Sequence, residues 1–372
     1  NRITFSNSFD HIQHAHIYYV CVPTPVDAQG GCDSSYVRSA CAAIIAARST
    51  DEPIIVVIKS TVVPGTLRSL HEEFSTPTTN VHFVYNPEFM REGCALQDIR
   101  TRNPIVLGAE SHDALHLVEQ LLTACLPAPT GIIKTNFETA ELIKYSWNTF
   151  SALRIAYVNE LATICRLLGA DIVPVVQGLA LSEQLLPTAQ LKPGPGYGGS
   201  CLPKDTIAFA HMLDCIGLNH TMPHHTIESN QQHKNRLVGD IVIGLELVRG
   251  PRTVTLLGLS FKAHTNDIRN SVALDIIPAL QARGVTVRVY DPVAMPTMQA
   301  VFHDVIYCTS AYEAAEDTDC IVILTEWPEF STLDLAVLGS VCRKKRIIDT
   351  RNLFSPTNLY NHGFDFITMG TL

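Results

Sequence analysis

The stretch Pro53-Ile54-Ile55-Val56-Val57-Ile58-Lys59 decides the fold class. Five consecutive β-branched apolar residues indicate a strand that is buried on both faces. Similar short apolar runs occur at residues 17–22, 81–85 and 104–108, and they alternate with segments of helical periodicity such as residues 34–47. Strands that are apolar throughout and alternate with helices are typical of a parallel sheet covered on both faces. The first part of the chain is therefore predicted to be α/β.

Two further regions extend this pattern. Helical periodicity continues over residues 137–166 and 172–183, and a long helix is predicted over residues 230–248. A second α/β pattern starts at Thr253, with a helix predicted over residues 271–283. Its predicted strands cover residues 254–259, 285–290, 320–325 and 346–349. The predicted order is α/β, then all-α, then α/β.

Composition limits the class of protein. A chain of 372 residues is long enough for two or three domains, and 46% apolar with 17% charged residues indicates a globular protein. A net charge of −9 without charged blocks argues against nucleic acid or an anionic membrane as partner. The sequence has no apolar run of 18 residues, so no membrane span is expected. Eleven singly scattered cysteines indicate reduced thiols of a cytosolic enzyme, and no histidine spacing predicts a metal site.

The strongest candidate for chemistry is the stretch GPGYGGSCLPKD, residues 194–205. Its first six residues match GxGxxG, but Lys192-Pro193 precedes them where a dinucleotide fingerprint needs a strand. We instead expect a tight turn that lets a ligand approach and presents Cys201 beside Lys204 and Asp205, because a positive neighbour favours the thiolate. The alternative is that Cys201 is a buried apolar residue, as we expect for the other ten cysteines.

Two pairs of polar residues are further candidates. Lys144 and Asn148 are spaced i, i+4 on one predicted helix, so both side chains face the same way. Glu88 and Glu92 follow a strand at the edge where open α/β sheets bind ligands. A solvated helix edge and a polar loop remain the respective alternatives.

A weaker signal follows the first strand of the second α/β region. Residues 258–262, GLSFK, precede a second basic residue, Arg269, and a predicted helix. A backbone turn flanked by lysine and arginine suits a diphosphate.

Eight segments in this order resemble the UDP-glucose/GDP-mannose dehydrogenase family. They are KSTVVPGT, NPEFMREG, ELIKYSWNTF with the downstream VNELA, PGPGYGGSCLPKD, GLSFKAHTNDIRNS, VYDP, TEWPEF and DTRNLF. The resemblance implies an NAD-dependent oxidation of the C6 alcohol of a nucleotide sugar to a carboxylate. It also implies two Rossmann-like domains joined by a central all-α domain that forms a homodimer. The implied boundaries are 1–136 for a partial NAD-binding domain, 137–235 for the central domain and 236–372 for the nucleotide-sugar domain.

The resemblance also implies catalytic roles. Cys201 would attack the C6 aldehyde to give a thiohemiacetal, which is oxidised to a thioester that water hydrolyses. Lys144 would stabilise the oxyanion and Asn148 would be a further donor. The remaining expected catalytic residues are Asp205 and Glu88 for proton transfer and Thr61 for positioning water.

Binding roles follow from the same resemblance. The residues expected to bind the nucleotide sugar are Phe89, Glu92, Tyr197, Gly198, Phe261 and Lys262. The residues expected to bind NAD are Thr24, Ser60, Lys204 and Arg269.

The sequence departs from the family's pattern at one place and narrows the substrate at another. Leu185-Leu186-Pro187 stands where UDP-glucose dehydrogenases commonly carry Arg-Ile-Gly. GYGGSC is similar to UDP-glucose dehydrogenases, whereas GDP-mannose enzymes more often show FAFGGSC and acetamido-sugar enzymes a histidine at Ser200. UDP-glucose is thus the first expectation, followed by GDP-mannose and then UDP-N-acetylamino sugars.

The beginning of the chain suggests a different alternative. No strand–GxGxxG–helix unit precedes Ile17, so the native protein is expected to be longer, with roughly two βα units upstream. A truncated nucleotide-sugar-binding protein without turnover is therefore the alternative of another class.

Overall fold

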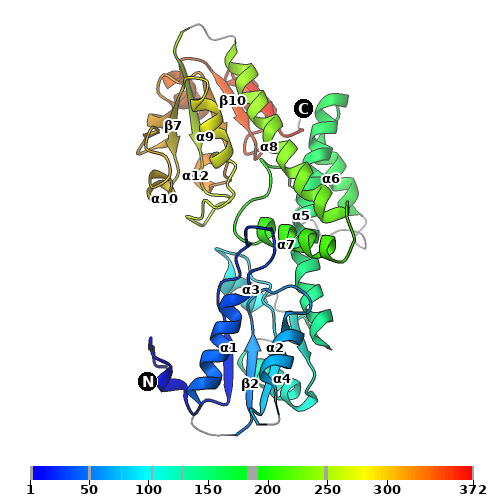
Figure 1. Ribbon diagram of the computed structural model, residues 1–372. Coiled ribbons are helices and arrows are strands. Elements are labelled where there is room, and N and C mark those ends of the chain that lie inside the picture. The colour runs from blue at the N-terminus through cyan, green and yellow to red at the C-terminus, as the bar shows by residue number, and fades with distance from the viewer. Residues whose placement is uncertain are drawn as a thin grey trace. The chain divides into compact units, whose positions relative to one another are not determined.

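The computed structural model describes residues 3–48, 52–76, 78–101, 104–126, 129–181, 192–246 and 250–370. The chain divides into two compact units. Unit 1 comprises Asn1–Thr149 and Lys204–Asn219, and unit 2 comprises Phe150–Pro203 and His220–Leu372. In Figure 1 the first segment of unit 1 is blue to teal, and the last segment of unit 2 runs from green to red.

Unit 1 contains a five-stranded sheet in the order β1-β2-β3-β4-β5. Its strands are β1 (Ile17–Val20), β2 (Ile54–Ile58), β3 (Val81–Tyr85), β4 (Pro104–Ala109) and β5 (Gly131–Thr135). Neighbouring strands are parallel except β3 and β4, which pair antiparallel. The expectation of a parallel sheet is therefore wrong at that one pair. The chain between them carries only the seven-residue helix α3 (Ala95–Thr101) and returns in the opposite direction.

Both faces of this sheet are covered. One face packs against α1 (Ser35–Ala47), α2 (Thr66–Phe74) and the start of α5 (Phe137–Leu168). The other face packs against α4 (His112–Cys125). Alternate strand residues point to opposite faces, so strands buried on both sides are apolar at every position. All five residues of β2 are buried, which confirms the buried strand predicted within residues 53–59.

Unit 2 contains a six-stranded sheet that is parallel throughout. Its strands are β6 (Arg252–Leu257), β7 (Val285–Tyr290), β8 (Ile306–Tyr307), β9 (Cys320–Ile323), β10 (Arg346–Asp349) and β11 (Asp365–Thr368). From one edge the order is β8-β7-β6-β9-β10-β11. This is the doubly wound order 3-2-1-4-5-6, which confirms a Rossmann-like sheet. The strand order reverses between β6 and β9, and ligands bind at the carboxyl ends of the strands at such a switch point.

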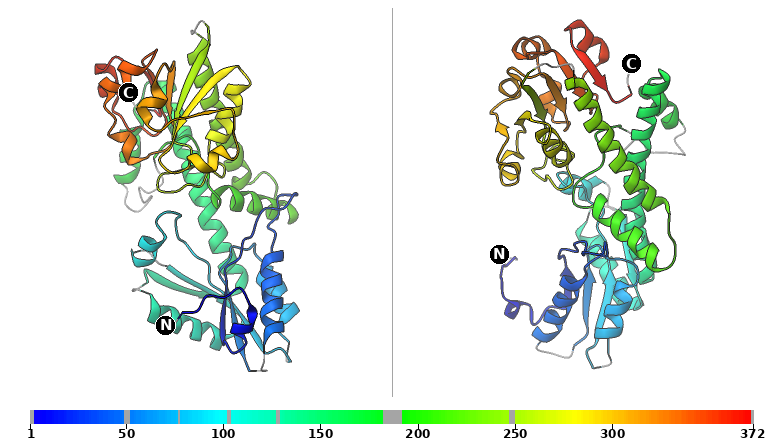
Figure 2. Two further views of the ribbon diagram at one scale, coloured as in Figure 1. Left: turned by 90° about the vertical axis from the view of Figure 1, so that its left-hand side faces the viewer. Right: turned by 45° about the horizontal axis from the view of Figure 1, so that its top comes forward.

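Helices cover this sheet as well (Figure 2). One face packs against the second half of α5 and against α6 (Ile172–Leu181), α8 (Met222–Glu246) and α9 (Ala273–Gln281). The other face packs against α11 (Ala311–Ala315), α12 (Pro328–Ser331), α13 (Leu335–Val341) and α14 (Pro356–Asn361). The remaining helices are η1 (Phe9–Ile12), α7 (Leu202–Cys215) and α10 (Met295–Gln299).

The central helices follow the prediction with one difference in length. Helix α8 begins at Met222, eight residues before the predicted start at Asn230. Pro223 is compatible with a first helical turn, where its missing N–H costs no hydrogen bond. The residues that follow Pro223 are mostly polar, so the sequence lacks the apolar periodicity that would have predicted this first part of the helix. Within the described residues, no helix is long and apolar enough to cross a membrane.

Candidate functional site

The carboxyl ends of β1 and β2 bring polar side chains together in unit 1. Ser60 lies just after β2, and its hydroxyl donates to the carbonyl of Val22 at 2.8 Å and accepts from the Val22 N–H at 2.9 Å. These bonds hold the loop after β1 against the end of β2. Thr24, in that loop, is buried, and its hydroxyl accepts from Lys204 Nζ at 3.4 Å.

Helix α5 carries a polar stripe into this region. Glu141, Lys144 and Asn148 are spaced i, i+3 and i+7, and all three are buried. The alternative interpretation, that Lys144 and Asn148 lie on a solvated edge of the helix, is therefore wrong. Burying an amide or an ammonium costs free energy unless it has partners, so the partners of these side chains define the site.

Lys144 lies between a carboxylate and an aromatic ring. Its Nζ is 3.4 Å from Glu88 Oε1 and 5.2 Å from the centre of the Phe89 ring. The Phe89 ring in turn meets Trp147 edge to face at 5.3 Å. The ammonium is thus held by charge and by a π face, and it can offer its remaining protons to a negatively charged oxygen.

Asn148 is bound to the second carboxylate. Its Nδ2 donates to Asp205 Oδ2 at 2.5 Å, and Lys204 Nζ donates to Asp205 Oδ1. Asp205 is 1% exposed. The amide and the ammonium thus bind one oxygen each, an arrangement that suits the ionised carboxylate because it accepts hydrogen bonds only.

Glu141 is a residue to which the sequence analysis assigned no role. Its carboxylate accepts from the backbone N–H of Gly65 at 2.7 Å and of Leu67 at 2.8 Å. It therefore caps the start of α2 and fixes the loop that carries Ser60 and Thr61. Burial raises the pKa of this carboxyl to about 7, although both hydrogen bonds act in the opposite direction. Its i, i+3 and i+7 spacing to Lys144 and Asn148, which places it on the same helix face as two predicted residues, was the signal that could have identified it.

Lys59 is a second residue for which the sequence predicted no role. Its Nζ donates to Asn86 Oδ1 at 3.1 Å and to the Asn86 carbonyl at 3.3 Å. Burial lowers the pKa of Lys59, and the nearby Glu88 carboxylate partly offsets this shift. Lys59, Asn86 and Glu88 line one side of a cavity of ≈ 130 Å³, whose other side is apolar. Glu88 therefore has two ammonium groups near it, one from Lys59 just after β2 and one from Lys144 on α5.

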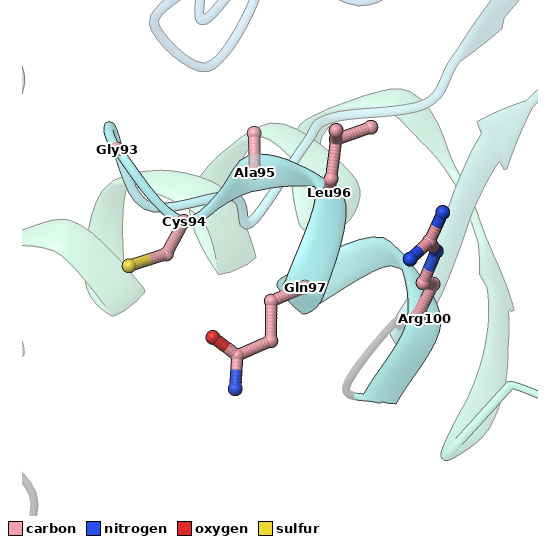
Figure 3. Close-up of a pocket in the computed structure, with 6 residues that line it drawn as sticks. All are labelled: Gly93, Cys94, Ala95, Leu96, Gln97 and Arg100. Atoms are coloured by element: carbon pink, nitrogen blue, oxygen red, sulfur yellow. The ribbon is translucent and has the colours of Figure 1, made fainter.

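A larger hollow of ≈ 550 Å³ lies elsewhere in unit 1, beside α3. Figure 3 shows its lining side chains, all of which come from the single segment 93–100. None of the predicted site residues lines it, so it plays no part in the site.

In unit 2 the glycine-rich turn is held at its backbone by side chains from helices. Gly194 donates its N–H to Asn159 Oδ1 on α5 at 2.8 Å, and its carbonyl accepts from His233 Nε2 on α8 at 2.7 Å. Asn230, also on α8, bonds both the N–H and the carbonyl of Tyr197, at 2.9 and 3.1 Å. The turn is therefore a fixed element and not a free loop.

The glycines of this turn are required by packing within the protein. A Cβ on Gly198 would lie 2.5 Å from the carbonyl oxygen of Asn270. Gly199 has φ +82°, and a Cβ there would lie 2.8 Å from the Phe261 ring. We expected the glycines to admit a ligand, whereas at these two positions they admit another part of the chain. Cys201 follows the turn, is exposed, and directly precedes α7.

The loop after β6 forms the opposite side of this packing. The Gly199 N–H donates to the carbonyl of Arg269 at 2.8 Å. The Arg269 guanidinium pairs with both oxygens of Asp267 at 2.7–3.0 Å, and Lys262 Nζ lies 5.4 Å from the Phe261 ring centre. Arg351 was not predicted, and it donates to the carbonyls of Leu324 at 2.8 Å and of Phe261 at 3.1 Å.

Each unit thus brings together its own share of the predicted residues. Unit 1 holds Thr24, Ser60, Thr61, Glu88, Phe89, Glu92, Lys144, Asn148, Lys204 and Asp205. Unit 2 holds Tyr197, Gly198, Cys201, Phe261, Lys262 and Arg269. Glu92 is exposed and is not among the residues that contact Lys144 or Asp205 in the interactions described above. The stretch Leu185-Leu186-Pro187 lies outside the described residues. In the described part of the chain, no group of three His, Cys, Asp or Glu side chains is placed to hold a metal ion.

Two α/β units with hydroxyls, lysines and carboxylates at the carboxyl ends of their strands define a class of nucleotide-binding enzymes. In unit 1 the Thr24 and Ser60 hydroxyls and the Lys204 ammonium fit a dinucleotide, because hydroxyls suit ribose and an ammonium suits a phosphate.

Comparison with known proteins agrees with this class. Residues 1–125, 138–232 and 255–356 match the NAD binding domain, the central domain and the UDP binding domain of the UDP-glucose/GDP-mannose dehydrogenase family. UDP-glucose 6-dehydrogenase TuaD of Bacillus subtilis is 37% identical over 378 residues, which cover 99% of this chain and 80% of that protein. The UDP-glucose 6-dehydrogenase of Rickettsia bellii is 32% identical and covers 100% of this chain and 85% of that one.

Solved structures agree as well. A UDP-glucose dehydrogenase from Pyrobaculum islandicum superposes with a TM-score of 0.87 at 29% identity and covers 100% of this chain and 84% of that one. A UDP-D-ManNAc dehydrogenase from Pyrococcus horikoshii has a TM-score of 0.83 at 26% identity, with coverages of 98% and 83%. The chain therefore belongs to the UDP-glucose/GDP-mannose dehydrogenase family. The predicted family, oxidoreductase class and NAD cofactor are confirmed.

Proposed function

We propose that this protein oxidises the C6 alcohol of UDP-glucose to the carboxylate of UDP-glucuronate, with two NAD⁺ reduced per sugar. The observation that carries the proposal is the buried array on α5, in which Lys144 pairs with Glu88 and Asn148 pairs with Asp205. An ammonium and an amide held by carboxylates can stabilise a developing oxyanion and move protons without rearranging.

The first oxidation converts the C6 alcohol to an aldehyde. Thr24, Ser60 and Lys204 of unit 1 would hold NAD⁺, which would supply the hydride acceptor for C6. The alcohol proton leaves through Glu88 or through water positioned by Thr61, while Lys144 stabilises the alkoxide. Phe89 lies against Lys144 and limits the access of water to it.

The second oxidation requires Cys201. Its thiolate adds to the aldehyde carbon, and Lys144 and Asn148 would stabilise the oxyanion of the resulting thiohemiacetal. Asp205, held as the ionised carboxylate, would accept a proton from the water that later hydrolyses the thioester. Loss of a second hydride from C6, for which a second NAD⁺ would be the acceptor, then gives a thioester, which water hydrolyses to the acid and the free thiol. Cys201 is exposed and stands immediately before α7, whose first turn carries Lys204 and Asp205, so the sequence itself links the thiol to the α5 array.

UDP-glucose is the preferred substrate among three classes. Relatives in Bacillus subtilis and Rickettsia bellii are named UDP-glucose 6-dehydrogenases, and residues 255–356 match a UDP binding domain. Ser200 before the cysteine is similar to that subgroup, and it places a hydroxyl 3.6 Å from Cys201 Sγ. GDP-mannose and UDP-N-acetylamino sugars remain the alternatives.

The deciding experiment mixes the 372-residue chain with NAD⁺ and each of the three sugar nucleotides. UDP-glucose should give two NADH per sugar. The rate of NADH formation with each of the other two sugar nucleotides should be less than a tenth of the rate with UDP-glucose. Cys201→Ala should form no acid, whereas Cys215→Ala, another exposed cysteine, should retain full activity. Absence of NADH with all three sugars, together with UDP binding, would support the alternative of a nucleotide-sugar-binding protein without turnover.

We further propose a homodimer through the central helices. Phe150, Tyr157 and Ile164 are exposed and lie seven residues apart on α5, so they share one face of the helix. A cytoplasmic location is consistent with the requirement for a reduced Cys201.

A further inference from the structure

Asp291 is a buried carboxylate at the carboxyl end of β7, outside the residues assigned to the chemistry. Its Oδ2 accepts from the backbone N–H of Leu259 at 2.7 Å and of Ser260 at 3.2 Å, and from the Ser260 hydroxyl at 3.3 Å. The indole Nε1 of Trp327 donates to the same oxygen at 3.0 Å. Oδ1 accepts from the N–H groups of Val293 and Ala294 at 2.9 and 2.7 Å. Six donors thus converge on one side chain.

The role of the Asp291 carboxylate follows from where its donors lie in the doubly wound sheet. In a doubly wound sheet, the N–H groups after the first strand bind the phosphates of a ligand, and an acidic residue at the end of the second strand binds its ribose. In unit 2 the first strand is β6 and the second is β7. The N–H groups after β6 and the acid after β7 are instead bonded to each other.

We propose that the Asp291 carboxylate binds the backbone N–H groups after β6, which in other doubly wound sheets bind the phosphates of a ligand. In this way Asp291 positions Phe261 and Lys262 to bind the nucleotide half of the substrate. It acts through the loop and is a positioning residue. The N–H groups of residues 258–261 already have acceptors within the protein, so this part of the loop has side chains rather than N–H groups to offer a nucleotide.

Three further contacts carry this effect from Asp291 into the rest of the loop. The Thr325 hydroxyl donates to the Ser260 carbonyl at 2.6 Å, and Arg351 donates to the carbonyl of Phe261. The Phe261 ring then packs where a Cβ on Gly199 would be. Asp291 therefore determines the position of the chain on which the glycine-rich turn rests.

The same contacts explain three sequence segments at once. GLSFK supplies the N–H groups, VYDP supplies the carboxylate and TEWPEF supplies the Trp327 indole. The Trp327 ring is itself held edge to face by His264 at 5.6 Å. Segments that lie about 30 residues apart in sequence thus meet at a single side chain.

The test is the variant Asp291→Asn, with UDP as the probe, so that the outcome does not depend on which sugar is the substrate. An amide nitrogen in place of one carboxylate oxygen faces N–H donors and cannot accept from them. The dissociation constant for UDP should rise about 10-fold or more, while that for NAD⁺ should stay within about twofold. Calorimetry with each ligand measures both constants. The exposed Asp304→Asn is the matched control in the same unit and should change neither.

A second variant distinguishes positioning from general destabilisation. Asp291→Gly removes the carboxylate, and added formate should restore part of the UDP affinity, whereas chloride at the same ionic strength should not. Unchanged UDP binding in Asp291→Asn would overturn the proposal. So would a parallel loss of UDP and NAD⁺ binding without rescue by formate, because this would show a structural role only. The proposed function fails separately, when the wild-type protein binds UDP yet forms no NADH.

Discussion

At the scale of single residues, the site consists of buried polar groups whose partners are other buried polar groups. Lys144 at 3% exposure and Asp205 at 1% exposure would each be costly alone. Each is retained because a second side chain satisfies it, Glu88 in one case and Asn148 in the other. Such pairs contribute little net stability, and for this reason we propose a chemical role for them.

Lys144→Ala tests this reading. Removal of the ammonium should lower kcat about 10²–10³-fold, as for the loss of one oxyanion donor, and leave the KM for NAD⁺ within about threefold. Initial rates of NADH formation measure both quantities. Lys134→Ala removes an exposed lysine of the same unit that pairs with Glu119, and it should be neutral. Equal activity of the two variants would exclude a catalytic role for Lys144.

Glu141 predicts a pH dependence of stability. Its pKa is about 7 in the folded protein and 4.5 in the unfolded chain, so the folded state binds the proton more tightly. The stabilisation is present below pH 4.5 and is lost as pH rises through about 7, which amounts to about 3 kcal/mol. In Glu141→Gln this loss should be absent from the pH dependence of the free energy of unfolding, measured with urea at several pH values.

The matched control for this prediction is Glu72→Gln, an exposed residue of α2. Its pH dependence should follow that of the wild type. A Glu141→Gln variant with the wild-type dependence would show that Glu141 does not titrate in this range.

At the scale of elements, the glycine-rich turn is built by close packing of three backbone segments. Asn230 on α8 bonds Tyr197 from one side, and Phe261 with Asn270 contacts Gly198 and Gly199 from the other. A side chain has no room on either glycine. The turn therefore presents Cys201 from a fixed base.

Gly199→Ala should destabilise unit 2 by more than backbone strain alone. Its φ of +82° costs about 1–3 kcal/mol for a non-glycine residue, and contact with Phe261 adds to this. Gly284→Ala has a φ of +69° with no atom within 4 Å, so it reports the strain without the contact. Urea unfolding of both variants measures the difference, and equal destabilisation would contradict the packing argument.

At the scale of the whole molecule, two α/β sheets serve two ligands. The family comparison assigns NAD to residues 1–125 and UDP to residues 255–356. Helix α5 is one of the elements that belong to both units, and it carries catalytic candidates in its first half and exposed apolar residues in its second. The same helix can therefore serve chemistry and assembly.

Ile164→Glu tests the assembly. A charge in the centre of an apolar contact should shift the protein from a dimer to a species of 40.9 kDa in analytical ultracentrifugation. Val337→Glu, an exposed position on α13, is the control and should leave the dimer intact. A wild-type protein that sediments as a monomer at all concentrations would refute the proposed dimer.

The pattern of apolar residues along the chain was enough to identify the class of the fold and most element positions. The apolar β2 and the β-branched and aromatic runs of β3, β7 and β10 could each be located within a residue or two. The exposed β5 and the short β8 carry no such signal, and the antiparallel pairing of β3 with β4 depends on a connection rather than on the strands. Motif order also determined the family, since eight segments rarely recur together by chance.

Which side chains are partners follows from the folded arrangement of the chain and not from the order of its residues. Whether Lys144 faces solvent or a carboxylate depends on Glu88, 56 residues away in sequence. The roles of Glu141 and Asp291 depend on backbone N–H groups 74–76 and 31–32 residues away. Hydrogen bonds to backbone groups leave no trace in the identity of the residue that donates them. For this reason the sequence could suggest candidate reacting groups but not the residues that position them.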